Sequence, residues 1–295
     1  MKLPFVTLDV FTRARFAGNP LAVVLDADGL DATVMQSIAR EFGHPETVFM
    51  LSPREAGHRA RLRIFTPARE LPFAGHPTVG TAVLVGLHDG AAPGDEFVLA
   101  EDIGPVRCKI ESRSNAHGSA RFVIPQLPTA AGTLPDDPAV AAALGLAPSD
   151  IGFAAFRPAR WSAGVPITFV PIGQLQAIAR CQPDPNRLAA LGDDPVYLFC
   201  AETIETGHAF HARMFAPALG VREDPATGAA AAAFAGVLAA RAGLADGEHA
   251  ITIEQGYEMG RPSLIRLAVT LVGGKLVSAS IGGEAVVVTE GEIEA

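Results

Sequence analysis

An internal repeat is the feature of this sequence that most restricts the folds open to it. Three pairs of segments match in the same order, and the members of each pair lie nearly half a chain length apart. The pairs are residues 63–68 with 213–218 (R-x-F-x-P-A), 77–82 with 225–230 (P-x-x-G-x-A) and 17–20 with 163–166 (A-G-x-P). One such match arises easily by chance, but three at a nearly constant offset indicate a duplicated domain.

The two halves are expected to meet near residues 115–125, because the segment 112–119 is polar and rich in turn-forming residues. We predict a first lobe over residues 1–118, joined by a C-terminal strand over 280–295, and a second lobe over 119–279. A chain of 295 residues is long enough for two such domains.

Short apolar runs bounded by glycine and proline predict strands in both halves. The predicted strands are 5–10, 22–25, 47–51, 61–65 and 97–100 in the first half, and 167–170, 196–200, 209–215 and 251–254 in the second. A helix is expected after Asp31, because Met35, Ile38 and Phe42 recur with helical spacing.

Two further predicted helices carry almost no charge on any face. One begins at Pro77 and ends before residues 88–90, and the other covers 225–242. A helix that is apolar all round is buried on all sides. A curved, mostly antiparallel sheet wrapped around one central helix meets that requirement, so we predict an α+β fold of two similar lobes.

The expected starts of these two helices are candidate anion sites. Pro77 and Pro225 suit the first helical position, and Asp224 is then a candidate N-cap. Helix N-termini offer unbonded N–H groups and a partial positive charge. If the repeat reflects a pseudo-two-fold arrangement, both starts should face one cleft between the lobes and hold a carboxylate or a developing enolate.

Each residue near these helix starts also has a simpler interpretation. Asp224 before a proline fits a helix cap alone, and His76 beside a helix start fits a packed histidine. Glu46 taken alone is one of 32 acidic residues and fits a surface carboxylate. Glu70 and Glu223, which flank the helix starts, are expected to be solvated charges.

His208 and His211 are the histidine pair most easily mistaken for a metal site. Their separation of three on a predicted strand should place the two side chains on opposite faces. The sequence therefore argues against a metal ion held by both, and we expect no metal site.

The composition excludes several classes of partner. The net charge of −9 argues against nucleic acid and anionic membranes as partners, because both favour a basic surface. The longest uncharged run, residues 225–240, is short for a membrane span, and residues 1–20 lack the apolar core of a signal peptide. Three cysteines without C-x-x-C spacing suit a reducing compartment, so we expect a cytoplasmic protein.

A set of short segments spread over nearly the whole chain carries a specific resemblance. They are 9–12 (DVFT), 16–24 (FAGNPLAVV), 45–49 (PETVF), 63–67 (RIFTP), 73–80 (FAGHPTVG), 223–228 (EDPATG), 254–256 (EQG) and 259–263 (MGRPS). With these segments the sequence resembles the phenazine-biosynthesis PhzF-like family, relatives of diaminopimelate epimerase.

The resemblance implies a fold and a chemistry. The fold is two similar α+β lobes, each a curved sheet around a central helix, with the active site between them. The chemistry is proton transfer without a cofactor on a small carboxylic acid, in an enzyme that forms a homodimer. Glu46 falls on the position of the glutamate that removes a proton from one carbon and returns one elsewhere.

The resemblance also assigns the remaining site residues. His76 and Asp224 join Glu46 as catalytic positions, and the substrate-binding positions are Asn19, Gly75, Gly228 and Ala229. The family's characterised isomerase has a serine where this chain has Ala229, so the hydroxyl contact of that serine is lost here. No cysteine lies at either helix start, which disfavours a racemase that uses a pair of thiols.

Three functions follow. The first is an isomerase or epimerase that moves a proton between carbons of a small carboxylate-bearing substrate, with Glu46 as the acid–base group. The alternative is a non-catalytic protein that binds small molecules on the same scaffold. The third is a different reaction without a cofactor, such as that of a lyase.

Overall fold

The computed structural model describes residues 1–134 and 136–295, and the chain divides into two compact units. Unit 1 comprises Met1–Pro125 and Ser280–Ala295, and unit 2 comprises Gln126–Ala279. The boundary expected after residue 118 falls inside strand β8 (His117–Val123), which pairs with other strands of unit 1. The polar segment 112–119 contains the turn of a hairpin, where Ser114 N–H bonds to the His117 carbonyl, and is not a linker.

Unit 1 contains most of the first half of the chain and its last strand. Its strands are β1 (Lys2–Val10), β2 (Asn19–Val24), β3 (Glu46–Leu51), β4 (His58–Phe65), β5 (Glu70–Leu71), β6 (Glu96–Glu101), β7 (Gly104–Arg113), β8 and the C-terminal part of β17 (Lys275–Glu294). Its helices are α1 (Ala32–Phe42) and α2 (Gly75–Asp89). The Asp31 carboxylate caps α1 by accepting from Val34 N–H, and Gly43 ends it with a left-handed φ of 63°.

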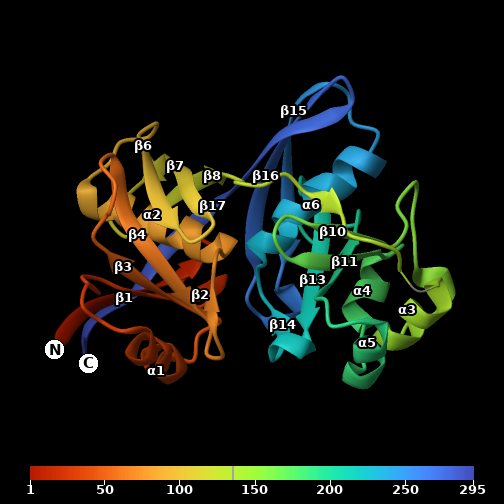
Figure 1. Cartoon of the computed structure of the whole chain (residues 1–295). Helices are drawn as coiled ribbons and strands as arrows, with labels where there is room; N and C mark the ends of the chain where they lie inside the picture. The colour runs from red at the N-terminus through yellow and green to blue at the C-terminus, as the bar shows by residue number, and fades with distance from the viewer. Residues whose placement is uncertain (135) are drawn as a thin grey trace. The chain divides into compact units, whose positions relative to one another are not determined.

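Helix α2 is buried along most of its length, from Gly75 to Gly86. It packs against β1, β2, β3, β7 and β8 (Figure 1). Two glycines make this close approach possible, because a Cβ at Gly80 would lie 2.6 Å from Leu21 and one at Gly86 would lie 2.7 Å from Ile110. The charge-free sequence of this helix thus corresponds to burial on every face.

Unit 2 contains the middle of the chain. Its strands are β9 (Thr129–Ala130), β10 (Ala159–Ser162), β11 (Pro166–Pro171), β12 (Val196–Cys200), β13 (Phe210–Ala216), β14 (Val221–Asp224), β15 (Gly247–Gln255), β16 (Ser263–Val272) and the start of β17. Its helices are α3 (Asp137–Leu144), α4 (Leu175–Arg180), α5 (Pro185–Leu191) and α6 (Gly228–Arg241), with single 3-10 turns at Pro148–Asp150, Pro217–Leu219 and Tyr257–Met259.

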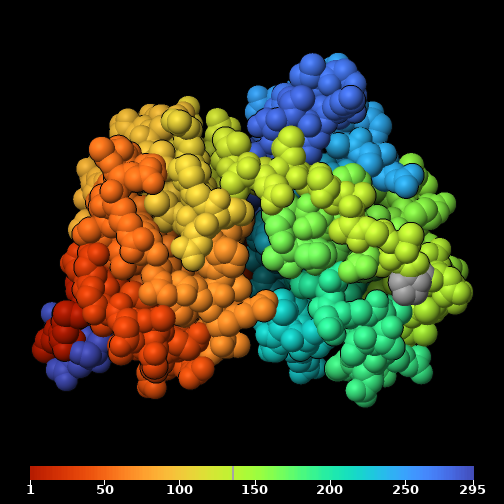
Figure 2. Space-filling model, viewed as in Figure 1, coloured from red at the N-terminus to blue at the C-terminus, as the bar shows by residue number. Residues whose placement is uncertain are grey.

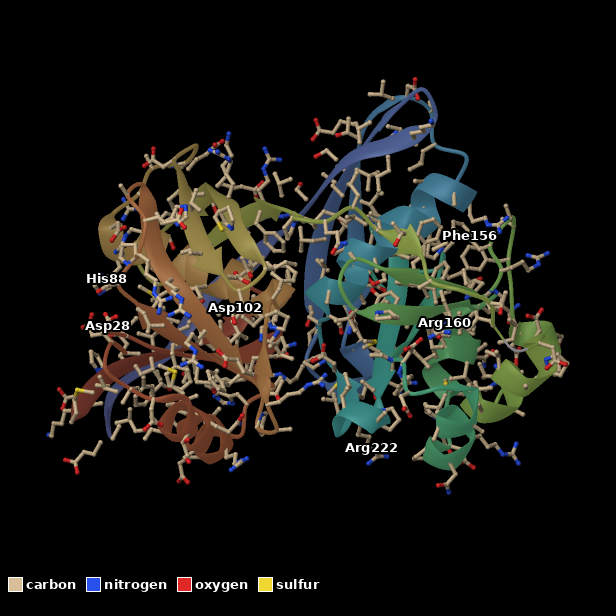
Figure 3. All side chains as sticks on the ribbon, in the orientation of Figure 1. Asp28, His88, Asp102, Phe156, Arg160 and Arg222 are labelled. Carbon is tan, nitrogen blue, oxygen red and sulfur yellow. The ribbon has the colours of Figure 1, made fainter. Side chains whose placement is uncertain are left out.

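Helix α6 is the buried helix of unit 2 and contacts β9, β10, β11 and β16. Phe234 on α6 packs edge-on against Phe199, with ring centroids 4.7 Å apart, and Phe199 in turn contacts Phe156 (Figure 3). Trp161 lies on β10, and a Cβ at Gly236 would lie 2.3 Å from its ring. Glycine is therefore needed where β10 crosses α6.

The strand pairings follow the same order in both units. In unit 1, β1–β2, β3–β4 and β6–β7 are antiparallel, whereas β2–β3 and β4–β6 are parallel. In unit 2, β10–β11, β12–β13 and β15–β16 are antiparallel, whereas β11–β12 and β13–β15 are parallel. The predicted class, a mixed α+β fold dominated by sheet, is confirmed at this level.

The expected starts of the two buried helices were wrong. Helix α2 begins at Gly75, so Pro77 is its third residue, a position whose N–H is also unbonded in a helix. Helix α6 begins at Gly228, with Thr227 as N-cap, and Pro225 lies in the preceding turn. Asp224 is therefore the last residue of β14 and not a helix cap.

Both ends of the chain lie in unit 1. Strand β1 pairs antiparallel with β17, with Lys2 opposite Glu294, and the amide of Ala295 donates to the carbonyl of Met1 over 2.7 Å. Figures 1 and 2 show the two ends side by side. The three cysteines are buried and unpaired. Within the described residues, no helix is both long and apolar enough to span a bilayer.

Candidate active site

Glu46 is the first residue of β3, at the end of unit 1 where the parallel strands β2 and β3 both begin. Its Cα lies opposite that of Leu21 on β2. Asn19, the first residue of β2, is completely buried. The Glu46 side chain is 18% exposed, so it is partly withdrawn from water while one edge stays accessible. The pairing of β2 with β3 thus gathers Asn19 and Glu46 at one edge of the sheet.

His76 from helix α2 meets Glu46 at this edge. Its Nδ1 lies 3.3 Å from Oε2 of Glu46. Burial lowers the pKa of His76 to about 3, although a hydrogen bond with the backbone of Pro20 acts in the opposite direction. The ring is therefore neutral at physiological pH, and its contact with Glu46 is not an ion pair between opposite charges. Nε2 of His76 is buried and has no hydrogen-bond partner among the described residues.

The start of α2 adds positive potential beside this pair. The helix has Ala74 as its N-cap, and no side chain caps it. The first amides of a helix have no intrahelical partner, and the helix dipole is positive there. Gly75 carries no side chain, so its backbone is open to close approach. A carboxyl group, a neutral imidazole and a helix N-terminus therefore meet within unit 1.

Asp224 lies at the corresponding place in unit 2, just before α6. Its Oδ2 accepts from the hydroxyl of Thr227. The buried side chain of Gln255 on β15 holds this turn, because its Nε2 donates to the Asp224 carbonyl over 2.7 Å and its Oε1 accepts from Thr227 N–H over 3.2 Å. Gly228 and Ala229 are the first two residues of α6, Gly228 buried and Ala229 half-buried.

Gly256 packs directly against the turn that precedes α6, and no larger residue fits at this position. It has a left-handed φ of 80°, and a Cβ there would lie 2.5 Å from the Arg261 carbonyl oxygen and 2.6 Å from the Pro225 carbonyl oxygen. Both neighbours are backbone atoms, so they have no rotamer through which to move away.

Gly256→Ala is therefore expected to destabilise unit 2, on the order of 3 kcal/mol in the free energy of unfolding. The matched control is Gly260→Ala, where φ is 69° but no atom lies within 4 Å of the added Cβ. That variant should lose only the left-handed strain, about 1–2 kcal/mol. Chemical denaturation of both variants measures the difference, and equal losses would contradict the close contact with Pro225.

The residues predicted from the sequence therefore form two sets. Glu46, His76, Gly75 and Asn19 lie together in unit 1. The other set consists of Asp224, Gly228 and Ala229, around the start of α6 in unit 2.

Comparison with known proteins identifies the family. The family model described as "Phenazine biosynthesis-like protein" matches residues 8–291. The chain belongs to this family. It is 49% identical to a protein of Mesorhizobium japonicum described as an uncharacterized isomerase, over 98% of each chain. It is 36% identical to trans-2,3-dihydro-3-hydroxyanthranilate isomerase of Pseudomonas chlororaphis, again over 98% of each chain.

A solved structure of the same family has the same fold. The phenazine biosynthesis protein of Bacillus anthracis, of the PhzF family, superimposes with a TM-score of 0.88 at 28% identity and covers 100% of both chains. Both of the full-length relatives described above are isomerases by name, and this chain is a PhzF-like isomerase.

Two arginine–glutamate pairs next to the helix starts of this isomerase were missed in the sequence. Arg63 on β4 holds Glu70 through two bonds of 2.6 Å, and Arg213 on β13 holds Glu223 through bonds of 2.8 and 3.0 Å. The prediction that these glutamates are solvated charges was wrong, because β5 and β14 fold back antiparallel onto the strands that carry the arginines. The recurrence of R-x-F in the repeat was the available signal.

His208 and His211 also differ from expectation. Only His211 lies within β13, so strand alternation does not separate them, and both rings contact Glu254. Nδ1 of His208 lies 2.7 Å from this carboxylate, Nδ1 of His211 lies 2.8 Å from it, and Nε2 of His211 lies 2.9 Å from Glu258. This buried cluster is bonded internally, and no group of metal-ligating side chains is found among the described residues.

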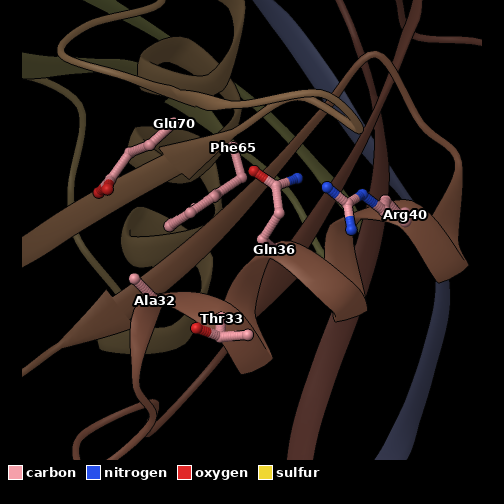
Figure 4. A pocket seen from close by; sticks show the side chains of 6 residues that line it. All are labelled: Ala32, Thr33, Gln36, Arg40, Phe65 and Glu70. Atoms are coloured by element: carbon pink, nitrogen blue, oxygen red, sulfur yellow. The ribbon is translucent and has the colours of Figure 1, made fainter.

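A pocket of about 370 Å³ lies elsewhere in unit 1, against helix α1 (Figure 4). It is lined by Ala32, Thr33, Gln36, Arg40, Phe65 and Glu70. Gln36 and Arg40 are engaged with the carbonyls of Thr66 and Pro67. None of the residues predicted to act in catalysis lines this pocket.

Proposed function

We propose that this isomerase moves a proton between two carbons of a small carboxylate-bearing substrate, with Glu46 as the acid–base group and without a cofactor. The observation that carries the proposal is the contact of Glu46 with a neutral His76 at the uncapped start of α2. A carboxylate held beside hydrogen-bond donors can remove a proton from carbon if the resulting negative charge is stabilised nearby.

His76 places a neutral ring against the carboxyl group of Glu46, with Nδ1 3.3 Å from Oε2. The Glu46 carboxylate takes a proton from the first carbon of the substrate. The protonated Glu46 then delivers a proton to the second carbon, so the carboxylate is regenerated and no oxidant or reductant is consumed.

The negative charge formed between these steps requires stabilisation. When a C–H bond next to an unsaturated carboxylic acid breaks, the charge spreads towards the carboxyl group. Unbonded amides at the start of α2 can hold that charge, each helix start contributing about 0.3–2 kcal/mol. Nε2 of His76 is buried and has no hydrogen-bond partner in the described part of the chain, so it offers a hydrogen bond to a substrate N–H or O–H.

We further propose that the start of α6 acts on the same substrate, at a site between two similar lobes of the diaminopimelate epimerase-like type. Supporting this, Gln255 holds Asp224 and Thr227 in a fixed turn ahead of α6. Asp224 then serves as the second catalytic group, while Asn19, Gly75, Gly228 and Ala229 line the substrate. A methyl group at Ala229 offers no hydroxyl contact, so we expect a substrate that differs from that of the Pseudomonas isomerases at the group facing α6.

Hydrogen exchange with solvent tests the proposal on the unmodified protein. In D₂O, a substrate should gain deuterium at the carbon that receives the proton, because the proton on Glu46 exchanges with solvent between the two steps. The probes are trans-2,3-dihydro-3-hydroxyanthranilate, the substrate in the name of the Pseudomonas relatives, and a panel of other unsaturated and 2-amino carboxylic acids.

Mass spectrometry and NMR follow the incorporation and its position. Deuterium in any acid supports proton transfer. If acids of the panel bind, as measured by a thermal shift, and none exchanges, the chain is a binding protein and the proposal fails.

A further inference from the structure

Glu101 is a buried carboxyl group that the proposed mechanism does not use. It is the last residue of β6, and only 7% of it is exposed. Among the described residues, no lysine, arginine or histidine lies within ion-pair distance of it. Its hydrogen-bond partner is the hydroxyl of Thr78 on α2, with Oγ1 2.8 Å from Oε1. A charged carboxylate in such a place would lack compensation, so its protonation state matters.

Counting protons at Thr78 settles which state fits the geometry. Oγ1 of Thr78 also lies 2.8 Å from the Ala74 carbonyl oxygen, but a hydroxyl has one proton to donate. If Glu101 were ionised, two acceptor oxygens would compete for that proton. If Glu101 is protonated, it donates to Thr78, and Thr78 donates to Ala74, so both contacts are satisfied.

The groups around Glu101 also oppose its ionisation. Asp102, the next residue along the chain (Figure 3), is itself acidic, and the guanidinium of Arg61 lies 3.8 Å from Asp102. Cys108 on β7 is a buried thiol whose pKa burial raises further. Burial raises the pKa of Glu101 to about 8, against the opposing effect of the Thr78 hydrogen bond.

Arg63 is a further cation near Asp102. It attracts Asp102 at longer range but is already paired with Glu70. Within the part of the chain that the structure describes, no ion pair stabilises a charge on Glu101.

The chain of bonds from Glu101 ends at the segment that carries His76. Ala74 is the N-cap of α2, and no side chain caps it, so the Thr78 hydroxyl provides a side-chain contact for this first turn. The turn after β6 holds the same segment from the other side, because Ile103 N–H donates to the Pro72 carbonyl over 3.1 Å. His76 lies between these two attachments.

We propose that Glu101 is a positioning residue: as a neutral acid it fixes the first turn of α2 and thereby His76 against Glu46, and its ionisation at alkaline pH loosens that turn. The effect on turnover rests on the function proposed above, whereas the effect on His76 does not. The proposal predicts that activity falls at alkaline pH because Glu101 ionises, although Glu101 does not itself take part in the reaction.

Glu101→Gln tests the first half of this proposal. Glutamine has the same shape and can donate to Thr78, but it does not ionise. Because the folded pKa of Glu101 lies above that of an unfolded glutamate, its stabilising effect is complete below pH 4.5 and is lost as the pH rises to about 8. The unfolding equilibrium constant of the wild type should rise relative to that of the variant by up to about tenfold per pH unit in this window.

The matched control is Glu96→Gln, an exposed glutamate of the same strand that pairs with Lys109. The ratio of its unfolding constant to that of the wild type should show no rise between pH 4.5 and 8. If Glu101→Gln shows none either, Glu101 is not a buried neutral acid, and the proposal is overturned.

The ¹⁵N resonances of the His76 ring test the second half. In the wild type they should shift in a single step near pH 8, although the ring itself stays neutral, and Glu101→Gln should abolish the step. Thr78→Val, which removes the relaying hydroxyl, should abolish it as well. A step that persists in both variants, or no step in the wild type, would overturn the positioning role.

These readouts need no substrate, so they stand apart from the proposed reaction. With any acid that exchanges deuterium, kcat can be measured as a function of pH. In Glu101→Gln the fall of kcat at alkaline pH should occur at least one pH unit higher than in the wild type. A fall at the same pH would overturn the effect on turnover. Absence of exchange with every acid would refute the proposed function while leaving the His76 result to decide the role of Glu101.

Discussion

Replacing Glu46 with glutamine is expected to reduce deuterium incorporation by about 10²–10⁴-fold, the contribution typical of a general acid–base group. The amide matches the carboxylate in shape and fits the same place beside His76, but it is not basic enough to remove a proton from carbon. The measurement is the rate of incorporation in D₂O at saturating substrate.

Binding and stability separate loss of chemistry from loss of structure in this variant. Because Glu46 begins a strand and is 18% exposed, Glu46→Gln should bind the same acids and unfold at nearly the same denaturant concentration. Glu55→Gln is the control, since Glu55 lies in the loop after β3 and its side chain is 76% exposed. This variant should incorporate deuterium into the substrate at the wild-type rate. Incorporation that continues at the wild-type rate in Glu46→Gln would show that another group moves the proton.

Replacing His211 with alanine is expected to destabilise the protein by about 3–5 kcal/mol, because the buried carboxylate of Glu254 and the half-buried carboxylate of Glu258 would lose the cation between them. Both ring nitrogens of His211 face carboxylate oxygens, from Glu254 at 2.8 Å and Glu258 at 2.9 Å. An imidazole that donates to two carboxylates carries both protons and is positively charged. Chemical denaturation at pH 6 measures the loss.

The pH dependence of the stability difference between the wild type and His211→Ala is a sharper test. Burial lowers the pKa of His211, but hydrogen bonds and charges from Glu258 and Glu254 outweigh it, so the pKa is raised above its usual 6.5. The stabilisation is therefore complete below pH 6.5 and is lost as the pH rises through the raised pKa. The difference between wild type and His211→Ala should shrink above that pH.

His88→Ala is the control for this effect. His88 is exposed in the last turn of α2 (Figure 3), and its removal should cost less than about 1 kcal/mol. A loss in His211→Ala no larger than that of His88→Ala would mean that the cluster holds no buried charge.

Local patterns in the sequence were sufficient for the strands that are apolar on both faces. The prediction for β12 matches its observed bounds, Val196–Cys200, because such a strand forms one uninterrupted apolar run. Strands β7 and β8 were missed for the opposite reason. In β7, buried Val106, Cys108 and Ile110 alternate with charged residues, so the run of apolar residues never exceeds one.

The site could be predicted only in part. A charge-free helix signals burial, but the contact of His76 with Glu46 joins two elements that lie far apart in the sequence. No local pattern reports such a contact, and it was expected only from the family resemblance. The same limit applies to Glu254, whose two histidine partners come from a different part of unit 2.

The place of the last strand has a consequence for how the chain is made. From Ser280 onward, β17 lies between β1 and β8 and pairs antiparallel with both. All the residues of unit 2 lie between β8 and this part of β17 in the sequence, so a growing chain completes them first. During synthesis, β1 and β8 therefore each keep one strand edge exposed until residues 280–294 of β17 have been added and the sheet of unit 1 can close.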